Sequence, residues 1–244
     1  METKDVITVA ISVLALIIST VATTISIIRG QKEKQRTVRN QITEVLSRIV
    51  AGNIENAKLY HETAQANPEY FQAISSILNQ QNAFLLNQAI YLTDQVPELV
   101  TAVEYNTLAT ANANAGDLIM AEKYYRKAVA VSPNDYFRAL AKRSFGAFLF
   151  AQRRFEEGRE EFRKAVSLLK GGDNMVRHTN GFTYQMWAWN ELNNARSVQR
   201  AQELVESAAN EFKGIDNEGV RRDALIGLKA AIKLPFENQQ VIKG

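Results

Sequence analysis

The sequence contains no cysteine, which excludes disulfide bonds and metal sites built on thiolates. It also has only four prolines and 12 glycines among its 244 residues, so few positions interrupt regular structure. The long stretches between these residues are rich in Ala, Leu and Gln, a composition that favours an all-α fold. A chain of this length is able to bury a full core as one soluble domain with an attached segment.

Histidine is scarce as well, which leaves little material for catalysis. His61 and His178 are the only two, and they lie in separate parts of the chain. No Ser-His-Asp order, glycine-rich phosphate loop or metal-ligand spacing surrounds either residue. The glutamates of residues 156–161 stand one helical turn from basic residues, which indicates a salt-bridged helix face and not a carboxylate pair for acid–base chemistry. We therefore expect a protein that is not an enzyme and has no cofactor or metal.

The net charge is low, at +3, and it is unevenly distributed. Residues 1–39 have six Lys or Arg and three Asp or Glu, whereas the remainder of the chain has 23 of each, so a nucleic-acid partner is not expected. Within that remainder, residues 59–122 carry seven acidic residues and no Lys or Arg, while residues 123–244 carry a net charge of +7. Either these blocks steer association with another copy, an acidic partner or anionic lipid, or they are only differently charged solvent faces.

The longest uncharged run comprises residues 6–28 and includes seven Ser or Thr. At about 1.5 Å per helical residue, it is long enough for a hydrocarbon core of about 30 Å. A cleavable signal peptide would have a shorter apolar region and a basic start, whereas this run is long and follows a barely basic tail, residues 1–5. We therefore predict a retained single-pass transmembrane helix over residues 6–28.

Cations flank the predicted membrane helix unequally. Lys4 and the terminal amine precede it, whereas residues 29–39 contain five Lys or Arg. Because positive flanking charge stays on the cytoplasmic side, we expect the soluble part of the protein there. Residues 29–39 then form a basic juxtamembrane stalk, whose charges either set only the topology or also attract anionic lipid.

Small residues recur along one face of the predicted membrane helix, at alternating intervals of four and three residues: Thr8, Ser12, Ala15, Ser19, Ala22 and Ser26. Such a stripe lets two membrane helices approach closely and share hydrogen bonds. It favours a homo-oligomer formed through this face, unless the hydroxyl residues only reflect the usual composition of single spans.

Residues 40–96 are predicted to form a pair of amphipathic helices. Apolar residues at helical spacing begin at Val38 and continue to about Gln65, and Pro68 opens the second helix, as proline does in a first turn. The pair does not share the spacing of the residues that follow it. It is therefore either a divergent repeat unit or an N-terminal cap.

Within residues 105–165 one pattern occurs twice, with matching positions 37 residues apart. The first copy has Tyr105, Leu108, Ala109 and Asn112, then Ala121, Tyr125 and Ala128; the second has Lys142, Phe145, Gly146 and Leu149, then Gly158, Phe162 and Ala165. The spacing predicts two antiparallel helices in each copy, with small residues where the helices approach. Gly116 and Asp117 suit the first turn as a left-handed helix end and an N-cap, and residues 152–154 fill the second turn.

Both copies resemble the tetratricopeptide repeat, a helix–turn–helix unit of about 34 residues. A third copy follows on the same intervals, with Gln185, Ala188, Trp189 and Leu192 in its first helix and Ala201, Val205 and Ala208 in its second. Asn112 stands where the family usually has an aromatic residue, and Trp189 where it has a small one. The third helix pair is therefore expected to be more widely spaced than the others, or not to be a true repeat.

The resemblance implies a concave groove that is lined by the first helix of each unit and receives an extended peptide or a partner helix. The residues that it places in the groove are Asn106, Thr110, Asn114, Arg143, Phe150, Met186 and Asn190. Chaperone-binding members of the family hold a terminal carboxylate with lysine and asparagine at such positions. This chain has no lysine there, and Arg143 is the cation suited to a carboxylate.

The sequence as a whole predicts an all-α protein, in which a single N-terminal transmembrane helix precedes an α-solenoid of antiparallel helix pairs. The repeats are expected over residues 97–212, a C-terminal capping helix over 213–234 and a flexible tail over 235–244. The expected function is that of a membrane-anchored scaffold or adaptor, which binds a peptide or helix of a partner protein in the groove. The alternative is a self-assembling structural membrane protein that associates through its transmembrane helix and its oppositely charged solenoid ends.

Overall fold

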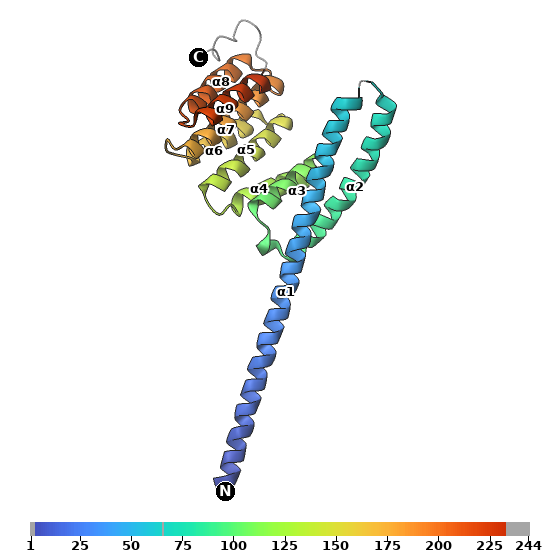
Figure 1. Cartoon of the computed structure of the whole chain (residues 1–244), viewed down its shortest axis with the longest axis vertical. Coiled ribbons are helices and arrows are strands. Elements are labelled where there is room, and N and C mark those ends of the chain that lie inside the picture. The colour runs from blue at the N-terminus through green and yellow to red at the C-terminus, as the bar shows by residue number, and fades with distance from the viewer. Residues whose placement is uncertain (1–2, 65, 233–244) are drawn as a thin grey trace. The chain divides into compact units, whose positions relative to one another are not determined.

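The computed structural model describes the backbone of residues 3–64 and 66–232, and their side chains from Thr24 onward except at 25 and 27 (Figure 1). All regular structure in this range is helical, which confirms the predicted all-α class. The elements are α1 (Thr3–Thr63), α2 (Pro68–Gln95), the short 3-10 helix η1 (Pro97–Leu99), α3 (Ala102–Asn114), α4 (Leu118–Ala130), α5 (Asp135–Ala151), α6 (Phe155–Leu168), α7 (Asn174–Asn193), α8 (Val198–Lys213) and α9 (Glu218–Ala231). The chain divides after Val100 into two compact units.

The first unit consists of α1, α2 and η1. Because α1 is one continuous helix, the predicted stalk at residues 29–39 is helical and continues into the amphipathic stretch after it. α2 begins at Pro68 behind Asn67, whose side chain caps the helix by accepting a hydrogen bond from the Tyr70 amide. The apolar residues buried in this helix pair are Val38, Ile42, Val45, Leu46 and Ile49 on α1, and Leu85, Leu86, Ala89 and Leu92 on α2.

No helix in the part of the chain that the structure describes is long and apolar enough to cross a membrane. The transmembrane prediction falls on residues 6–28, most of which lie outside the range of described side chains. The same holds for five members of the small-residue face, Thr8, Ser12, Ala15, Ser19 and Ala22, while the sixth, Ser26, is exposed. The association of copies through this face stays a prediction.

The second unit is built from helix pairs. α3 packs with α4, α5 with α6 and α7 with α8 (Figure 1). The first helices of consecutive pairs also contact each other, α3 with α5 and α5 with α7, and α9 packs against α8 and α7. The closing helix thus lies within the predicted range of 213–234 but ends at Ala231.

Both repeated stripes form the core of their helix pairs, apart from Lys142, which is partly exposed and pairs with Glu161. The core residues of the first pair include Tyr105, Leu108, Ala109, Asn112, Ala121, Tyr125 and Ala128, and each is at most 5% exposed. In the second pair, the backbones approach at two glycines: a Cβ on Gly146 would lie 3.1 Å from the carbonyl oxygen of Gly158, and one on Gly158 3.0 Å from that of Gly146. The small residues of the pattern therefore set the closest contact between the helices, as the spacing predicts.

The turns of the first two pairs have the same hydrogen-bond pattern. The Asp117 amide donates to the Asn112 carbonyl, and 37 residues later the Arg154 amide donates to the Leu149 carbonyl. A residue with positive φ closes each turn, Gly116 at 85° in the first and Arg153 at 59° in the second. The predicted turn positions are confirmed, although only the first turn has the glycine that usually marks them.

The third pair has one more residue in its turn than the other two. Arg196, with φ 58°, takes the left-handed position. The Ser197 amide then donates to the carbonyl of Glu191, six residues back, where the other turns span five. Helix α7 is therefore shifted by one residue against the alignment predicted from Leu192.

This shift changes which residue of α7 faces α8. Ala188 is 0% exposed and takes the small position that Gly146 has in the second pair. The prediction that Trp189 occupies this position is wrong, since its side chain turns outward and is 47% exposed. The prediction of a wider spacing depends on Trp189 at this position, and the buried Ala188 removes that reason. At Gly181 of α7 a Cβ would lie 2.3 Å from the Phe212 ring of α8, so this glycine makes room for the ring.

Ion pairs join consecutive helix pairs. Arg154 donates to Glu122 of α4 at 2.5 Å, and Arg159 of α6 donates to Glu191 of α7 through Nε and Nη2, both at 2.7 Å. Glu191 is 0% exposed and accepts a further hydrogen bond from Trp187 Nε1 at 3.0 Å. Glu122 on α4 and Arg159 on α6 hold matching positions 37 residues apart. The second helix of the pair therefore supplies the anion where the first pair meets the second, and the cation where the second pair meets the third.

Candidate functional site

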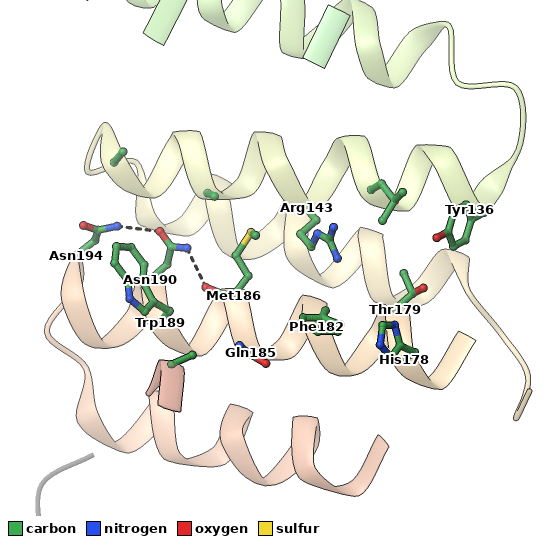
Figure 2. Close-up of a pocket in the computed structure, with 14 residues that line it drawn as sticks. Tyr136, Arg143, His178, Thr179, Phe182, Gln185, Met186, Trp189, Asn190 and Asn194 are labelled. Carbon is green, nitrogen blue, oxygen red and sulfur yellow. Dashed lines mark hydrogen bonds between the residues drawn. The ribbon is translucent and has the colours of Figure 1, made fainter. Parts of the chain in front are cut away.

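A cavity of about 720 Å³ opens between the first helices of the second and third pairs (Figure 2). It lies entirely within the second unit. The residues that line it are Tyr136, Leu140, Arg143, Ala147 and Ala151 on α5, His178, Thr179, Phe182, Gln185, Met186, Trp189 and Asn190 on α7, Asn194 after α7, and Ala231 on α9. Its position is that of the predicted groove, on the side where first helices contact each other.

Helical spacing brings these side chains to one face of each helix. On α5 the lining residues recur every three or four positions, from Tyr136 to Ala151, and on α7 they do so from His178 to Trp189. Ala147 and Ala151 are small, so α5 contributes little side-chain volume at its C-terminal end. The larger residues of α7 lie opposite, and the difference in size leaves the cavity.

Arg143 supplies the charge of this site. Its guanidinium projects from α5 into the space between α5 and α7 (Figure 2). Its Nε is buried without a hydrogen-bond partner, and no ion pair of Arg143 is found among the described residues. Burial lowers the pKa of Arg143 below its ordinary value because the charged form loses hydration, and no Asp or Glu lines the cavity to offset this loss. Arg143 is therefore a half-buried cation without a counterion.

Gln185 presents a second unpartnered polar atom. Its Oε1 is buried without a hydrogen bond, and the residue lies on α7 across the cavity from α5. The cavity therefore offers an unpaired donor on Arg143 and an unpaired acceptor on Gln185. Buried polar groups in folded proteins almost always have hydrogen-bond partners. A ligand that carries both an acceptor and an N–H donor, as a peptide does, would satisfy both.

The rest of the wall is apolar and aromatic. Phe182, Met186 and Trp189 are 37%, 37% and 47% exposed, which is high for such large side chains. His178 packs edge-on against Phe182, with ring centroids 4.7 Å apart. These side chains form a surface on which an apolar segment is able to bury area.

Two asparagines at the end of the cavity are already satisfied by the helix itself. Asn190 Nδ2 donates to the Met186 carbonyl at 2.8 Å, and Asn194 Nδ2 donates to Asn190 Oδ1 at 2.8 Å (Figure 2). Asn190 is only 2% exposed. Its amide therefore holds the end of α7 and is not free to bind a ligand.

The structure brings together three of the predicted groove residues, Arg143, Met186 and Asn190. Phe150 requires a correction, because it is 0% exposed and packs against Phe155 and Phe162, with ring centroids 5.7 and 5.9 Å away. It lies on the α6 side of α5, where it fills the core of the second pair.

The three predicted residues on α3 lie outside this cavity. Thr110 forms a hydrogen bond with the Tyr125 hydroxyl at 3.1 Å and donates to the Asn106 carbonyl at 3.0 Å. Asn106 Oδ1 is buried without a partner, and Asn114 is exposed at the end of the helix. The α3 residues therefore do not share a site with Arg143 in this structure.

Sequence reasoning missed Phe182, Gln185 and Trp189 as groove residues. Their positions follow from those of Arg143 and its neighbours once α7 is shifted by one residue. The signal for this shift is the small residue at 188, which fits the close approach to α8 better than Trp189 does.

Among the described residues, no group of three or more His, Cys, Asp or Glu is placed to hold a metal ion. Comparison with protein-family models and with curated proteins finds no match to the chain. The proposal for its function therefore depends on the chemistry of the cavity and on the sequence.

Proposed function

We propose that this protein is a binding scaffold whose α5–α7 cavity holds an apolar peptide segment bearing a carboxylate. The observation that carries the proposal is the half-buried Arg143 guanidinium, which has an unpartnered Nε and no acidic residue in the surrounding cavity. An unpaired buried charge is costly, and a bound carboxylate would relieve that cost. Gln185 would accept from a backbone N–H of the same segment, and Phe182 and Trp189 would cover its apolar side chains.

The resemblance to the tetratricopeptide repeat supports the same proposal, because that family receives peptides along its first helices. The three helix pairs of the second unit, and the matching turns of the first two, are compatible with such an array. No catalytic step belongs to the proposal, since binding requires only the donor, the acceptor and the apolar wall.

We also propose that residues 6–28 anchor the scaffold in a membrane, with the helix pairs on the cytoplasmic side. The support is the uncharged run itself and the five cations that follow it within residues 29–39. A reporter enzyme fused after Gly244 would test the orientation. Activity of a reporter that works only outside the cytoplasm would contradict it.

The test of the cavity uses a synthetic library of apolar peptides, each made with a free C-terminal carboxylate and again as its amide. Binding to the full-length protein is measured by isothermal titration calorimetry. Peptides with the free carboxylate should bind, and their amides should bind about 10- to 100-fold more weakly, because a hydrogen bond to a charged group contributes about 1.5–3 kcal/mol.

Substitutions then assign the effect to Arg143. Arg143→Gln should weaken binding of the carboxylate peptides to the level of their amides, and Arg143→Lys should keep part of the difference. Arg138→Gln is the matched control, since Arg138 lies on the same helix but already pairs with Asp135 at 2.6 Å. Equal affinity for acid and amide peptides, or full affinity in Arg143→Gln, would refute the proposed function.

A further inference from the structure

The far end of the α1–α2 hairpin has no core of its own. From Val50 to Phe84 no described residue is buried, although nearly all of this stretch is helical. The residues that do become buried lie towards the other end of the hairpin, such as Ile42 and Ile49 on α1 and Leu86 and Ala89 on α2. Helices gain most of their stability from packing an apolar face, so about half of this hairpin lacks the usual source of stability.

The exposed apolar side chains of α2 are regularly spaced. Tyr70, Ile77, Phe84 and Tyr91 follow one another at intervals of seven residues and are 51%, 61%, 69% and 69% exposed. A seven-residue interval keeps side chains on one face of a helix, and it is the interval by which helices pair with other helices. α2 already uses a different face to pack against α1. The stripe therefore is a second packing surface.

The residues around the stripe favour a second copy of the same chain as the occupant. The only charged residues of α2 are Glu69 and Asp94, near its two ends, and the helix between them carries amides and hydroxyls. An amide both donates and accepts, so it pairs well with another amide, whereas a charged neighbour would select a partner of opposite charge.

The hairpin already uses this chemistry internally. Asn82 Nδ2 donates to Asn53 Oδ1 at 3.1 Å, and Asn56 Nδ2 donates to Asn79 Oδ1 at 3.4 Å, both between α1 and α2. Amide pairing thus joins the two helices of one copy. The same type of residue borders the stripe on the outer face, at Gln80, Gln81 and Gln88.

The stripe is also symmetric about its midpoint, with large apolar residues at equal distances on both sides. A two-fold axis between Gln80 and Gln81 would bring Tyr70 opposite Tyr91 of the second copy and Ile77 opposite Phe84 of the second copy. Every position then meets a large apolar side chain, as an isologous interface requires. We propose that the protein dimerises through antiparallel packing of α2 on α2 of a second copy, along the stripe Tyr70–Ile77–Phe84–Tyr91.

The area available is that of a weak dimer. Large side chains of this kind bury about 150–250 Å² each, so the four exposed fractions together offer about 500 Å² per copy. Two copies would bury about 1,000 Å² in total, which is at the lower limit for a specific interface. The dimer should therefore form in a concentration-dependent manner.

Single cysteines test this arrangement directly, because the natural chain has no thiol of its own. The full-length protein, purified in detergent, is treated with a short bismaleimide linker. Gln81→Cys, between Ile77 and Phe84 on the stripe, should give a cross-linked dimer. Ala83→Cys, which is also exposed but is turned about 100° around the helix from Phe84, should not.

Ala73→Cys distinguishes the antiparallel arrangement from a parallel one. Ala73 is exposed on the stripe side, and in the antiparallel dimer its two copies lie about 22 Å apart along the axis. It should therefore not link to itself, whereas parallel helices would link at Ala73 as readily as at Gln81. Linking at all three positions, or at Ala73, would overturn the proposal.

The mass of the uncross-linked protein provides the second measurement. Sedimentation should show a dimer that dissociates on dilution, and Ile77→Glu should shift it to a monomer at all concentrations. Ile226→Glu, at an equally exposed isoleucine on α9, should leave the dimer intact. A wild-type monomer at high concentration, or a Gln81→Cys chain linked only to a different polypeptide, would refute self-association through α2.

Discussion

Removing the carboxylate of Glu191 should destabilise the second unit more than any change to an exposed ion pair. Glu191 is 0% exposed and its partner Arg159 is 12% exposed, so the substitution Glu191→Ala removes the buried counterion and leaves the guanidinium only Glu156, which is 76% exposed. The hydrogen bond to Glu191 is also the main reason why the pKa of Arg159 is raised. Breaking one partner of a buried pair costs about 3–5 kcal/mol. At roughly 2–4 °C per kcal/mol for a protein of this size, Tm should fall by about 6–20 °C.

The double substitution Arg159→Met with Glu191→Leu separates this effect from a simple loss of packing. Leu149 holds the position of Glu191 in the second helix pair, so leucine suits this environment. Replacing both charges should cost less than about 2 kcal/mol, part of it from Trp187 Nε1, which loses its acceptor.

Urea denaturation followed by circular dichroism measures both free energies of unfolding. Glu44→Ala serves as a control, since Glu44 and Arg48 are 62% and 63% exposed in their ion pair and should contribute about 0.5 kcal/mol or less. The reasoning fails if Glu191→Ala costs less than about 1 kcal/mol, or if the double variant is as unstable as the single one.

Two further predictions concern packing and pH. Gly158→Ala would place a Cβ 2.5 Å from Phe150 Cδ2 and should lower the free energy of unfolding in urea by about 1–3 kcal/mol. Gly227→Ala has open space around it and should raise that free energy by up to about 1 kcal/mol. A change of the same sign in both variants would contradict the packing argument. The hydrogen bond from Arg154 lowers the pKa of Glu122 below its ordinary value of 4.5. The contribution of the Glu122 carboxylate to folding stability is therefore fully present above pH 4.5 and is lost as the pH falls through the folded-state pKa. The Tm difference between wild type and Glu122→Gln should therefore be largest near about pH 6–7 and shrink towards about pH 3, and a constant difference would count against it.

The helix pairs of the second unit could be predicted because their sequence pattern and their packing obey the same constraint. Ala109 and Gly146 had to be small for two backbones to approach, and that requirement is visible in the sequence. The turn at Gly116 was equally clear. The turn at Arg153 could be placed only by its distance from the first, because its left-handed residue is an arginine.

The site was harder to predict because its residues are the ones that stay unpacked between α5 and α7. A single extra residue before Arg196 rotates α7 by one position, which exchanges Trp189 for Ala188 at the helix contact. The matching intervals favoured the alignment through Leu192, and the small residue at 188 was the one sequence signal for the other. Burial decided between them: Glu191 has a buried partner in Arg159, and Trp189 has space in the cavity.

The reversed charges at the two junctions impose a fixed order on the helix pairs. If the second pair were duplicated in tandem, Arg154 of the new copy would meet Arg159 of the old one, where it now meets Glu122. Two guanidinium groups would then face each other in a partly buried seam, and Leu149 would offer no carboxylate to separate them. Duplicating the second pair alone would therefore place like charges at the new junction and reduce stability.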